Sequence, residues 1–181
     1  SAAENALSEL RDRAVDGPTW ANLGDGYLRR GLLRQAAAPL EQALELGGAD
    51  ARAHTGLGQI ALRRGDDFNQ GVTSLKAAIR ADPDHLMAYC VLARAYLDRD
   101  MPDGAQYAHR AIARDLGFAL PYRVLGDWHA EREEDREARR FYQAYLERES
   151  DDIAVAARFG RVLLRLRDYA SIDRQIGRAH V

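Results

Sequence analysis

The residue types that most often do chemistry are scattered along this 181-residue chain. Its single cysteine, Cys90, would need a nearby base to act as a nucleophile, and the sequence indicates none. The five histidines show no spacing that is typical of a metal site; they are His54, His85, His109, His129 and His180. We therefore predict no catalytic residue, no metal site and no cofactor.

One short segment matches a tolerant form of the glycine motif that binds dinucleotides. It runs Gly56-Leu-Gly58-Gln-Ile-Ala61. That motif requires a preceding strand and a phosphate at the start of the following helix. Here the glycines are expected in the middle of a helix, so we interpret the match as coincidence.

Composition and charge exclude several classes of partner. Hydrophobic residues make up 46 % of the chain, charged residues 30 %, and the net charge is −2. This balance provides no global field that would attract nucleic acid or an anionic membrane. No apolar run is long enough to span a membrane. A lone cysteine excludes an internal disulfide but leaves the compartment open, with a cytoplasmic location favoured.

A helix-pair pattern begins after Asp16. Trp20, Leu23 and Tyr27 are spaced to share one face of a helix. Gly24 lies beside that face and lets a second helix approach closely. Gly31 suits a tight turn, because positive φ is inexpensive only for glycine. The pattern predicts a first helix that ends in a sharp turn.

The second helix of this pair has its own stripe. Ala36, Leu40 and Ala43 recur at i, i+4 and i+7, which predicts packing against the first helix. Pro39 falls inside this helix, where proline removes a backbone hydrogen bond. We expect a slight kink there and no break.

The same pattern returns along the chain. The signature pairs Leu57-Gly58, Leu125-Gly126 and Phe159-Gly160 match Leu23-Gly24, and Leu92-Ala93 is a variant of it. The predicted units are 17–50, 51–85, 86–118 and 119–152, and residues 153–181 are predicted to form either a partial fifth unit or a C-terminal cap. Residues 1–16 are predicted to form a helix that is either a partial repeat or a cap.

This repeat resembles the tetratricopeptide repeat (TPR), whose signature is W-x2-L-G-x2-Y with a small residue in the second helix. The resemblance covers nearly the whole chain and implies a TPR protein of bacterial origin. It implies an all-α, right-handed superhelical solenoid of antiparallel helix pairs. Such pairs stack because no single pair buries its own apolar stripe.

The end of the chain permits two interpretations. Residues 172 and 176 continue the second-helix stripe of the fifth unit, but the chain stops at Val181. The last residues, 176–181, also read like a translated sequencing adapter. Either this is a natural C-terminus or the chain is a fragment of a longer reading frame.

The resemblance also implies where a ligand binds, because the first helices of this family line a concave groove. Carried onto this chain, the fifth, ninth and thirteenth places of the units supply the candidate residues. They are Asp25, Arg29, Gln59, Arg63, Cys90, Arg94, Asp98, Arg123, Asp127, Arg161 and Arg165. The arginines favour a protein or peptide ligand with acidic groups. The alternative is a solvated polar face with internal ion pairs, such as Arg94 with Asp127.

The remaining charged segment, Glu131–Arg140, is expected to cover a turn and a solvated face, with Asp135 and Arg139 spaced as a helix ion pair. His129 takes the place of Tyr27 and is expected to pack.

We predict a non-catalytic scaffold for a protein or peptide. The alternative is the partner-recruiting arm of a larger enzyme whose catalytic domain lies outside this chain. The chaperone-tail clamp of the family is not expected, because Ala21 and Asp25 replace its Lys and Asn. The mixed charge also argues against nucleic acid. The partner's identity and the oligomeric state stay open.

Overall fold

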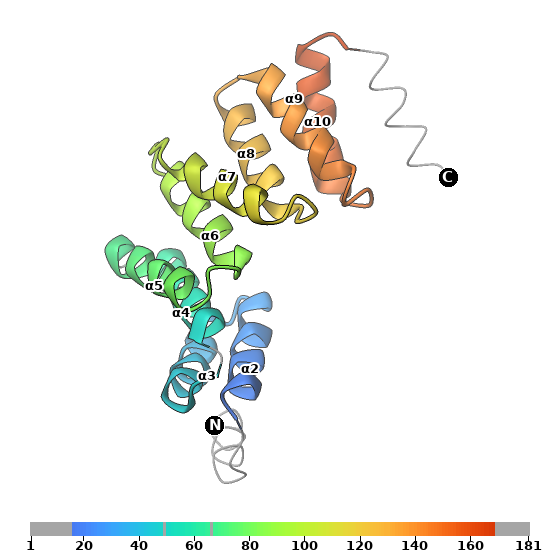
Figure 1. The fold of residues 1–181 in the computed structure, drawn as a ribbon. Coiled ribbons are helices and arrows are strands. Elements are labelled where there is room, and N and C mark those ends of the chain that lie inside the picture. The colour runs from blue at the N-terminus through green and yellow to red at the C-terminus, as the bar shows by residue number, and fades with distance from the viewer. Residues whose placement is uncertain (1–15, 49, 66, 169–181) are drawn as a thin grey trace. The chain divides into compact units, whose positions relative to one another are not determined.

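The computed structural model describes residues 16–48, 50–65 and 67–168, which contain nine α-helices and no strand. In chain order they are α2 (Gly17–Arg29), α3 (Leu33–Leu46), α4 (Asp50–Arg64), α5 (Phe68–Ala81), α6 (Leu86–Leu97), α7 (Gly104–Arg114), α8 (Leu120–Glu131), α9 (Asp135–Leu146) and α10 (Ile153–Arg165) (Figure 1). The predicted all-α fold class is confirmed. The expected N-terminal helix and the second helix of the fifth unit lie outside the described residues.

The helices form two compact units, residues 1–95 and 96–181, whose boundary falls within α6. In the first unit α2 packs against α3, α3 against α4, and α4 against α5. In the second unit α7 packs against α8, α8 against α9, and α9 against α10. Short connections make consecutive helices antiparallel, as Figure 1 shows for the pairs within each unit.

The first pair illustrates how local sequence sets the helix bounds. The Asp16 carboxylate accepts a hydrogen bond from the Thr19 backbone N–H at 2.9 Å, which caps α2. Pro18 lies in the first turn, where its missing N–H costs nothing. Trp20 and Leu40 are buried in the core between α2, α3 and α4.

Small residues allow the paired helices to approach closely, as predicted. A Cβ built on Gly24 would lie 2.5 Å from Leu40 Cγ. The equivalent contacts are 2.8 Å from Gly58 to Leu75 Cγ and 2.7 Å from Gly126 to Tyr142 Cδ1. Carbon atoms normally pack at about 3.5–4.0 Å, so each position excludes a side chain. We call this feature, a glycine that faces a large residue of the next helix, the glycine notch.

The turn inside each pair contains one residue with left-handed backbone. Gly31 (φ 74°) and Gly65 (φ 75°) confirm the predicted turn glycines. The later pairs place Asp100, Glu133 and Arg167 in the same conformation, with φ of 57°, 58° and 56°. Sequence reasoning missed these three positions because it searched for glycine. The turn geometry therefore repeats even where the favoured residue does not.

The structure tests two local predictions, one for Pro39 in α3 and one for an ion pair between Asp135 and Arg139 in α9. Pro39 is buried inside α3, and the helix continues through it without a break. The expected ion pair between Asp135 and Arg139 was wrong. Arg165 of α10 binds Asp135 at 2.6 Å instead, and Arg139 lies 3.0 Å from Asp168. Both charges thus join α9 to the α10 side of the unit, because tertiary packing offers closer partners than the helix itself.

Candidate functional site

The predicted ligand-binding residues lie on the first helix of each pair, with the exception of Asp98, which directly follows α6. We call the surface that these residues form within each compact unit the first-helix face of that unit.

In the first unit, α2 and α4 are linked by polar contacts across this face. Arg52 Nη1 donates a hydrogen bond to Asn22 Oδ1 at 2.5 Å, and Arg52 Nε lies 3.9 Å from Asp25 Oδ2. Arg63 Nη1 donates to the Leu28 carbonyl at 3.4 Å. The sequence prediction did not include Arg52, because it drew only on the fifth, ninth and thirteenth places of the units. These contacts hold arginine side chains of α4 against α2.

Burial shifts the pKa values of two side chains in this region, Asp25 and His85. Desolvation raises the pKa of Asp25, and the cations Arg52 and Arg29 oppose that rise. Desolvation also lowers the pKa of His85. The His85 Nε2 atom is buried and has no hydrogen-bond partner among the described residues. Burial therefore disfavours the charged forms of both side chains.

In the second unit, the carboxylate of Asp127 is only 4 % exposed and is a focus of polar contacts. Tyr142 Oη donates to Asp127 Oδ1 at 2.8 Å, and Arg158 Nη1 donates to the same atom at 2.7 Å. Arg123 Nε lies 3.9 Å from Asp127 Oδ2. A buried carboxylate needs such partners, because an unpaired buried charge is costly. Asp127 consequently serves the structure and is not offered to a ligand.

Asp152 extends this network between α9 and α10. It accepts a hydrogen bond from Tyr145 Oη at 2.8 Å and lies 3.7 Å from Arg123 Nη1. Its pKa is lowered, chiefly by the hydrogen bond from the Val155 backbone N–H at the start of α10. The side chains of Arg123 and Arg158 remain 38 % and 40 % exposed. They are thus held by acidic side chains while more than a third of each arginine side chain stays exposed to solvent.

The arginines of α10 form a row. Arg158, Arg161 and Arg165 share one side of the helix. Arg165 binds Asp135 through both Nε and Nη2, at 2.6–2.9 Å. Arg161 is exposed and has no side-chain partner in the part of the chain that the structure describes. Sequence reasoning missed Arg158, because its sixth place in the unit is outside the family's groove pattern.

Two other candidates are placed differently. Cys90 is 2 % exposed, and burial raises the pKa of its thiol to about 12, so it is neither a presented ligand contact nor a thiolate at neutral pH. His129 packs as expected: its ring stacks on Phe141 at 5.4 Å, and Nδ1 lies 2.6 Å from Glu134 Oε2.

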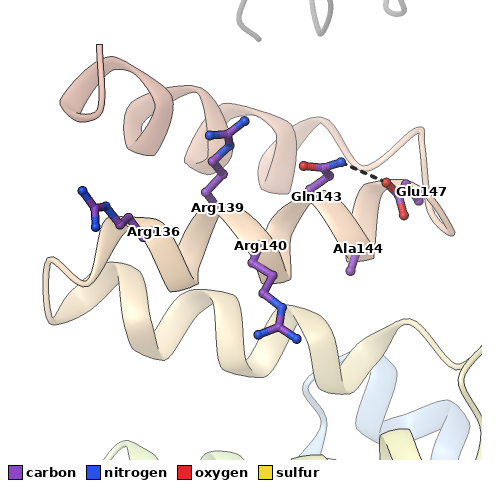
Figure 2. Close-up of a pocket in the computed structure, with 6 residues that line it drawn as sticks. All are labelled: Arg136, Arg139, Arg140, Gln143, Ala144 and Glu147. Carbon is purple, nitrogen blue, oxygen red and sulfur yellow. Dashed lines mark hydrogen bonds between the residues drawn. The ribbon is translucent and has the colours of Figure 1, made fainter. Parts of the chain in front are cut away.

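A shallow hollow occurs elsewhere, on the exposed side of α9. It is lined by Arg136, Arg139, Arg140, Gln143, Ala144 and Glu147. Figure 2 shows Arg139 and Arg140 pointing to opposite sides of α9. Gln143 Nε2 donates to Glu147 Oε1 at 3.1 Å at one end of the hollow. Because its cations diverge, this hollow is a weaker candidate for an anion site than the first-helix face.

No group of three or more His, Cys, Asp or Glu side chains is placed to hold a metal ion within residues 16–48, 50–65 and 67–168. In the same residues, no helix combines the length and apolar character needed to cross a membrane.

Comparisons of sequence found no relatives: no family model matches the chain. No curated protein matches it either.

Comparisons of structure did find similar folds. PilF of Pseudomonas aeruginosa is 21 % identical with a TM-score of 0.76, over 93 % of this chain and 76 % of that protein. A thermophilic TPR protein of Thermus thermophilus is 21 % identical with a TM-score of 0.70, over 83 % and 82 % of the two chains. A tetratricopeptide repeat protein from Parabacteroides merdae is 13 % identical with a TM-score of 0.67, over 99 % and 71 %. The helix pairs, the glycine notches and these similarities establish that the chain has the tetratricopeptide-repeat fold.

Proposed function

We propose that this chain is a non-catalytic scaffold that binds a protein or peptide with acidic groups on its first-helix face, which is the concave face in this fold family. Similarity to TPR folds supports a helical-repeat scaffold of the kind generally used in protein interactions. Burial of Cys90, the single cysteine of the sequence, argues against a thiol nucleophile.

The observation that carries the proposal is the arginine row of α10. Arg158 and Arg165 are fixed by Asp127 and Asp135, while Arg161 between them is exposed. A guanidinium presents a planar fork of donors that matches a carboxylate. Side chains that are already ordered lose less entropy when a ligand binds. Arg161 can therefore offer its fork to a ligand carboxylate, between two arginines whose positions are already fixed.

The test is a binding assay with labelled peptides. Short acidic peptides, rich in Asp and Glu, are titrated with the wild type and followed by fluorescence anisotropy, beside peptides in which Asn and Gln replace the acids. Only the acidic set should bind. Arg161→Glu should weaken binding at least about tenfold, since it replaces an attractive charge by a repulsive one.

The matched control is Arg136→Glu on α9. Arg136 is also exposed, so the variant changes the net charge by the same amount away from the first-helix face. It should leave binding unchanged. If both variants weaken binding equally, the effect comes from net charge and the proposed site is wrong. Equal binding of neutral and acidic peptides would reject the acidic ligand.

A further inference from the structure

Two tyrosines of α9 reach across their helix pair to acidic side chains of α8 and of the start of α10. Tyr142 Oη donates a hydrogen bond to Asp127 Oδ1 at 2.8 Å, and Tyr145 Oη donates to Asp152 Oδ2, at the N-cap of α10, at 2.8 Å. The tyrosines are three residues apart, so they lie on one side of α9. The sequence prediction of the site included neither of them. One second helix thus supplies a hydroxyl donor to two carboxylates.

Both acids also lie close to an arginine of a first helix. Asp127 Oδ1, the atom that accepts from Tyr142, also accepts from Arg158 Nη1 at 2.7 Å. Asp152 Oδ2 lies 3.7 Å from Arg123 Nη1, which is beyond hydrogen-bond distance. Tyr142, Asp127 and Arg158 therefore form a chain of two hydrogen bonds that runs from α9 through α8 to α10. The corresponding chain that ends at Arg123 is looser.

The Tyr142 hydroxyl restricts the orientation of the buried Asp127 carboxylate. Burial raises the pKa of the Tyr142 phenol, and the hydrogen bond to Asp127 adds to the rise, so the hydroxyl keeps its proton and stays a donor. Because Oδ1 accepts from Tyr142 and from Arg158, the carboxylate has little freedom to rotate about its Cβ–Cγ bond. Without the hydroxyl, Oδ1 would lose a buried donor, and Asp127 and Arg158 would have more freedom to reorient together.

This freedom matters for ligand binding because of where Arg158 lies. Its side chain is 40 % exposed, and it shares one side of α10 with Arg161. The planar fork of a guanidinium must be oriented correctly to pair with a carboxylate. An arginine that is already ordered also loses less entropy when a ligand binds. The orientation of Arg158 before binding therefore bears on affinity.

We propose that Tyr142 is a positioning residue of the first-helix face of the second unit. Through Asp127, it holds the Arg158 guanidinium in the orientation that pairs with a ligand carboxylate beside Arg161. Tyr145 acts in the same way on Arg123, with a smaller effect because the contact between Arg123 and Asp152 is longer. The role in binding rests on the proposed function, whereas the orientation of Arg158 is a property of the chain alone.

The first measurement therefore needs no ligand. Nitrogen NMR relaxation of the Arg158 Nε–Hε group in the full chain gives its order parameter, and the signal is assigned by its loss in Arg158→Lys. Tyr142→Phe removes the hydroxyl and keeps the ring, and it should lower this order parameter. The matched control is Tyr122→Phe, which removes a hydroxyl that donates to the Leu116 carbonyl at 3.2 Å instead. It should leave the order parameter of Arg158 unchanged.

The second measurement is binding of the labelled acidic peptides described above. Tyr142→Phe should weaken binding about three- to tenfold, because one more long side chain must be ordered in the complex. Tyr145→Phe should weaken binding less, and Tyr122→Phe should leave binding unchanged. Circular dichroism verifies that all three variants remain helical.

A double-mutant cycle separates positioning from a general loosening of the fold. If Tyr142 acts through Arg158, Tyr142→Phe should have no further effect on binding in the Arg158→Gln background. Arg158→Lys is a second background, to be used should Gln unfold the unit, because Lys keeps a positive charge beside Asp127 but lacks the fork. The same absence of effect is expected there.

An unchanged order parameter of Arg158 in Tyr142→Phe would overturn the proposal, whether or not a peptide binds. So would a loss of binding that persists in the Arg158 variants, or one that Tyr122→Phe causes equally. A failure of the proposed function looks different: wild type then binds acidic and neutral peptides equally, while the order parameter still falls in Tyr142→Phe. That result would keep the positioning of Arg158 and reject only the acidic ligand.

Discussion

The comparison of Gly126→Ala with Gly160→Ala tests the packing argument most directly. Both glycines occupy the same place of their units, in the middle of α8 and α10. At Gly126 a new Cβ would lie 2.7 Å from Tyr142 Cδ1 and 2.9 Å from Cε1. At Gly160 it would have no neighbour within 4 Å among the described residues. The same substitution therefore meets a filled notch in α8 and, as far as the described residues go, an open one in α10.

The magnitude follows from two effects. Replacing Gly by Ala in a helix stabilises it by about 1 kcal/mol, and this gain is common to both variants. Overpacking costs about 1–3 kcal/mol where neighbours cannot move. Tyr142 is buried, and its hydroxyl is held by Asp127 at 2.8 Å, so its ring cannot swing away freely. Gly160→Ala should raise the free energy of unfolding by about 1 kcal/mol, and Gly126→Ala should lie about 1–3 kcal/mol below it.

The assay is urea unfolding followed by the helical signal in far-ultraviolet circular dichroism, with melting temperature as a second measure. Wild type and both variants are measured under identical conditions. A difference below about 0.5 kcal/mol between the variants would refute the reasoning, because such a value is within the scatter of ordinary surface substitutions. Stabilisation by Gly126→Ala equal to that by Gly160→Ala would also show that α8 and α9 do not pack as described.

Three further predictions concern single residues. Asp127→Ala should lower the free energy of unfolding of the second unit by about 2–3 kcal/mol, because it removes the hydrogen-bond acceptor of Tyr142 and Arg158. The control is Asp151→Ala at an exposed acid, which should change the free energy of unfolding by less than about 0.5 kcal/mol; urea unfolding measures both. Glu133→Gly should raise the melting temperature and stabilise by up to about 1 kcal/mol, because φ is 58° there, while Gly31→Ala should destabilise by a similar amount. Burial lowers the pKa of His85 in the folded state below its usual 6.5, so the fold favours the neutral imidazole. The contribution of neutral His85 to the free energy of unfolding is therefore present above pH 6.5 and is lost as pH falls through the folded-state pKa. Wild type should then lose more stability between about pH 7 and 5 than His85→Gln does, and parallel pH profiles would contradict this.

The fold followed closely from the sequence because its signals are local. The turn glycine Gly31 and the interhelical contact of Gly24 depend on backbone conformation and on spacing within about 20 residues, both of which a repeat pattern displays. The turn residues Asp100, Glu133 and Arg167 were missed, since a non-glycine residue gives no local sign that packing will hold it in a left-handed conformation.

The candidate site was less predictable, because helical position alone does not reveal which polar side chains face one another. Asp127 and Arg161 both occupy the ninth place of a unit, but Asp127 is buried beside Tyr142 and Arg158 while Arg161 is exposed. Asp135 lies correctly for a pair with Arg139, yet it binds Arg165, which is 30 residues away along the chain.

By itself, then, the sequence determined the helix pairs, their turns and the small residues between them, because these depend on spacing along one chain segment. Only the tertiary structure decided which acids hold which arginines, and that Arg161 is the exposed member of the arginine row of α10. It also decided that the notches at Gly24, Gly58 and Gly126 are filled, whereas the one at Gly160 is open among the described residues. The physical reason is that burial and ion pairing are properties of neighbours in space, and a residue's place in a repeat does not specify those neighbours.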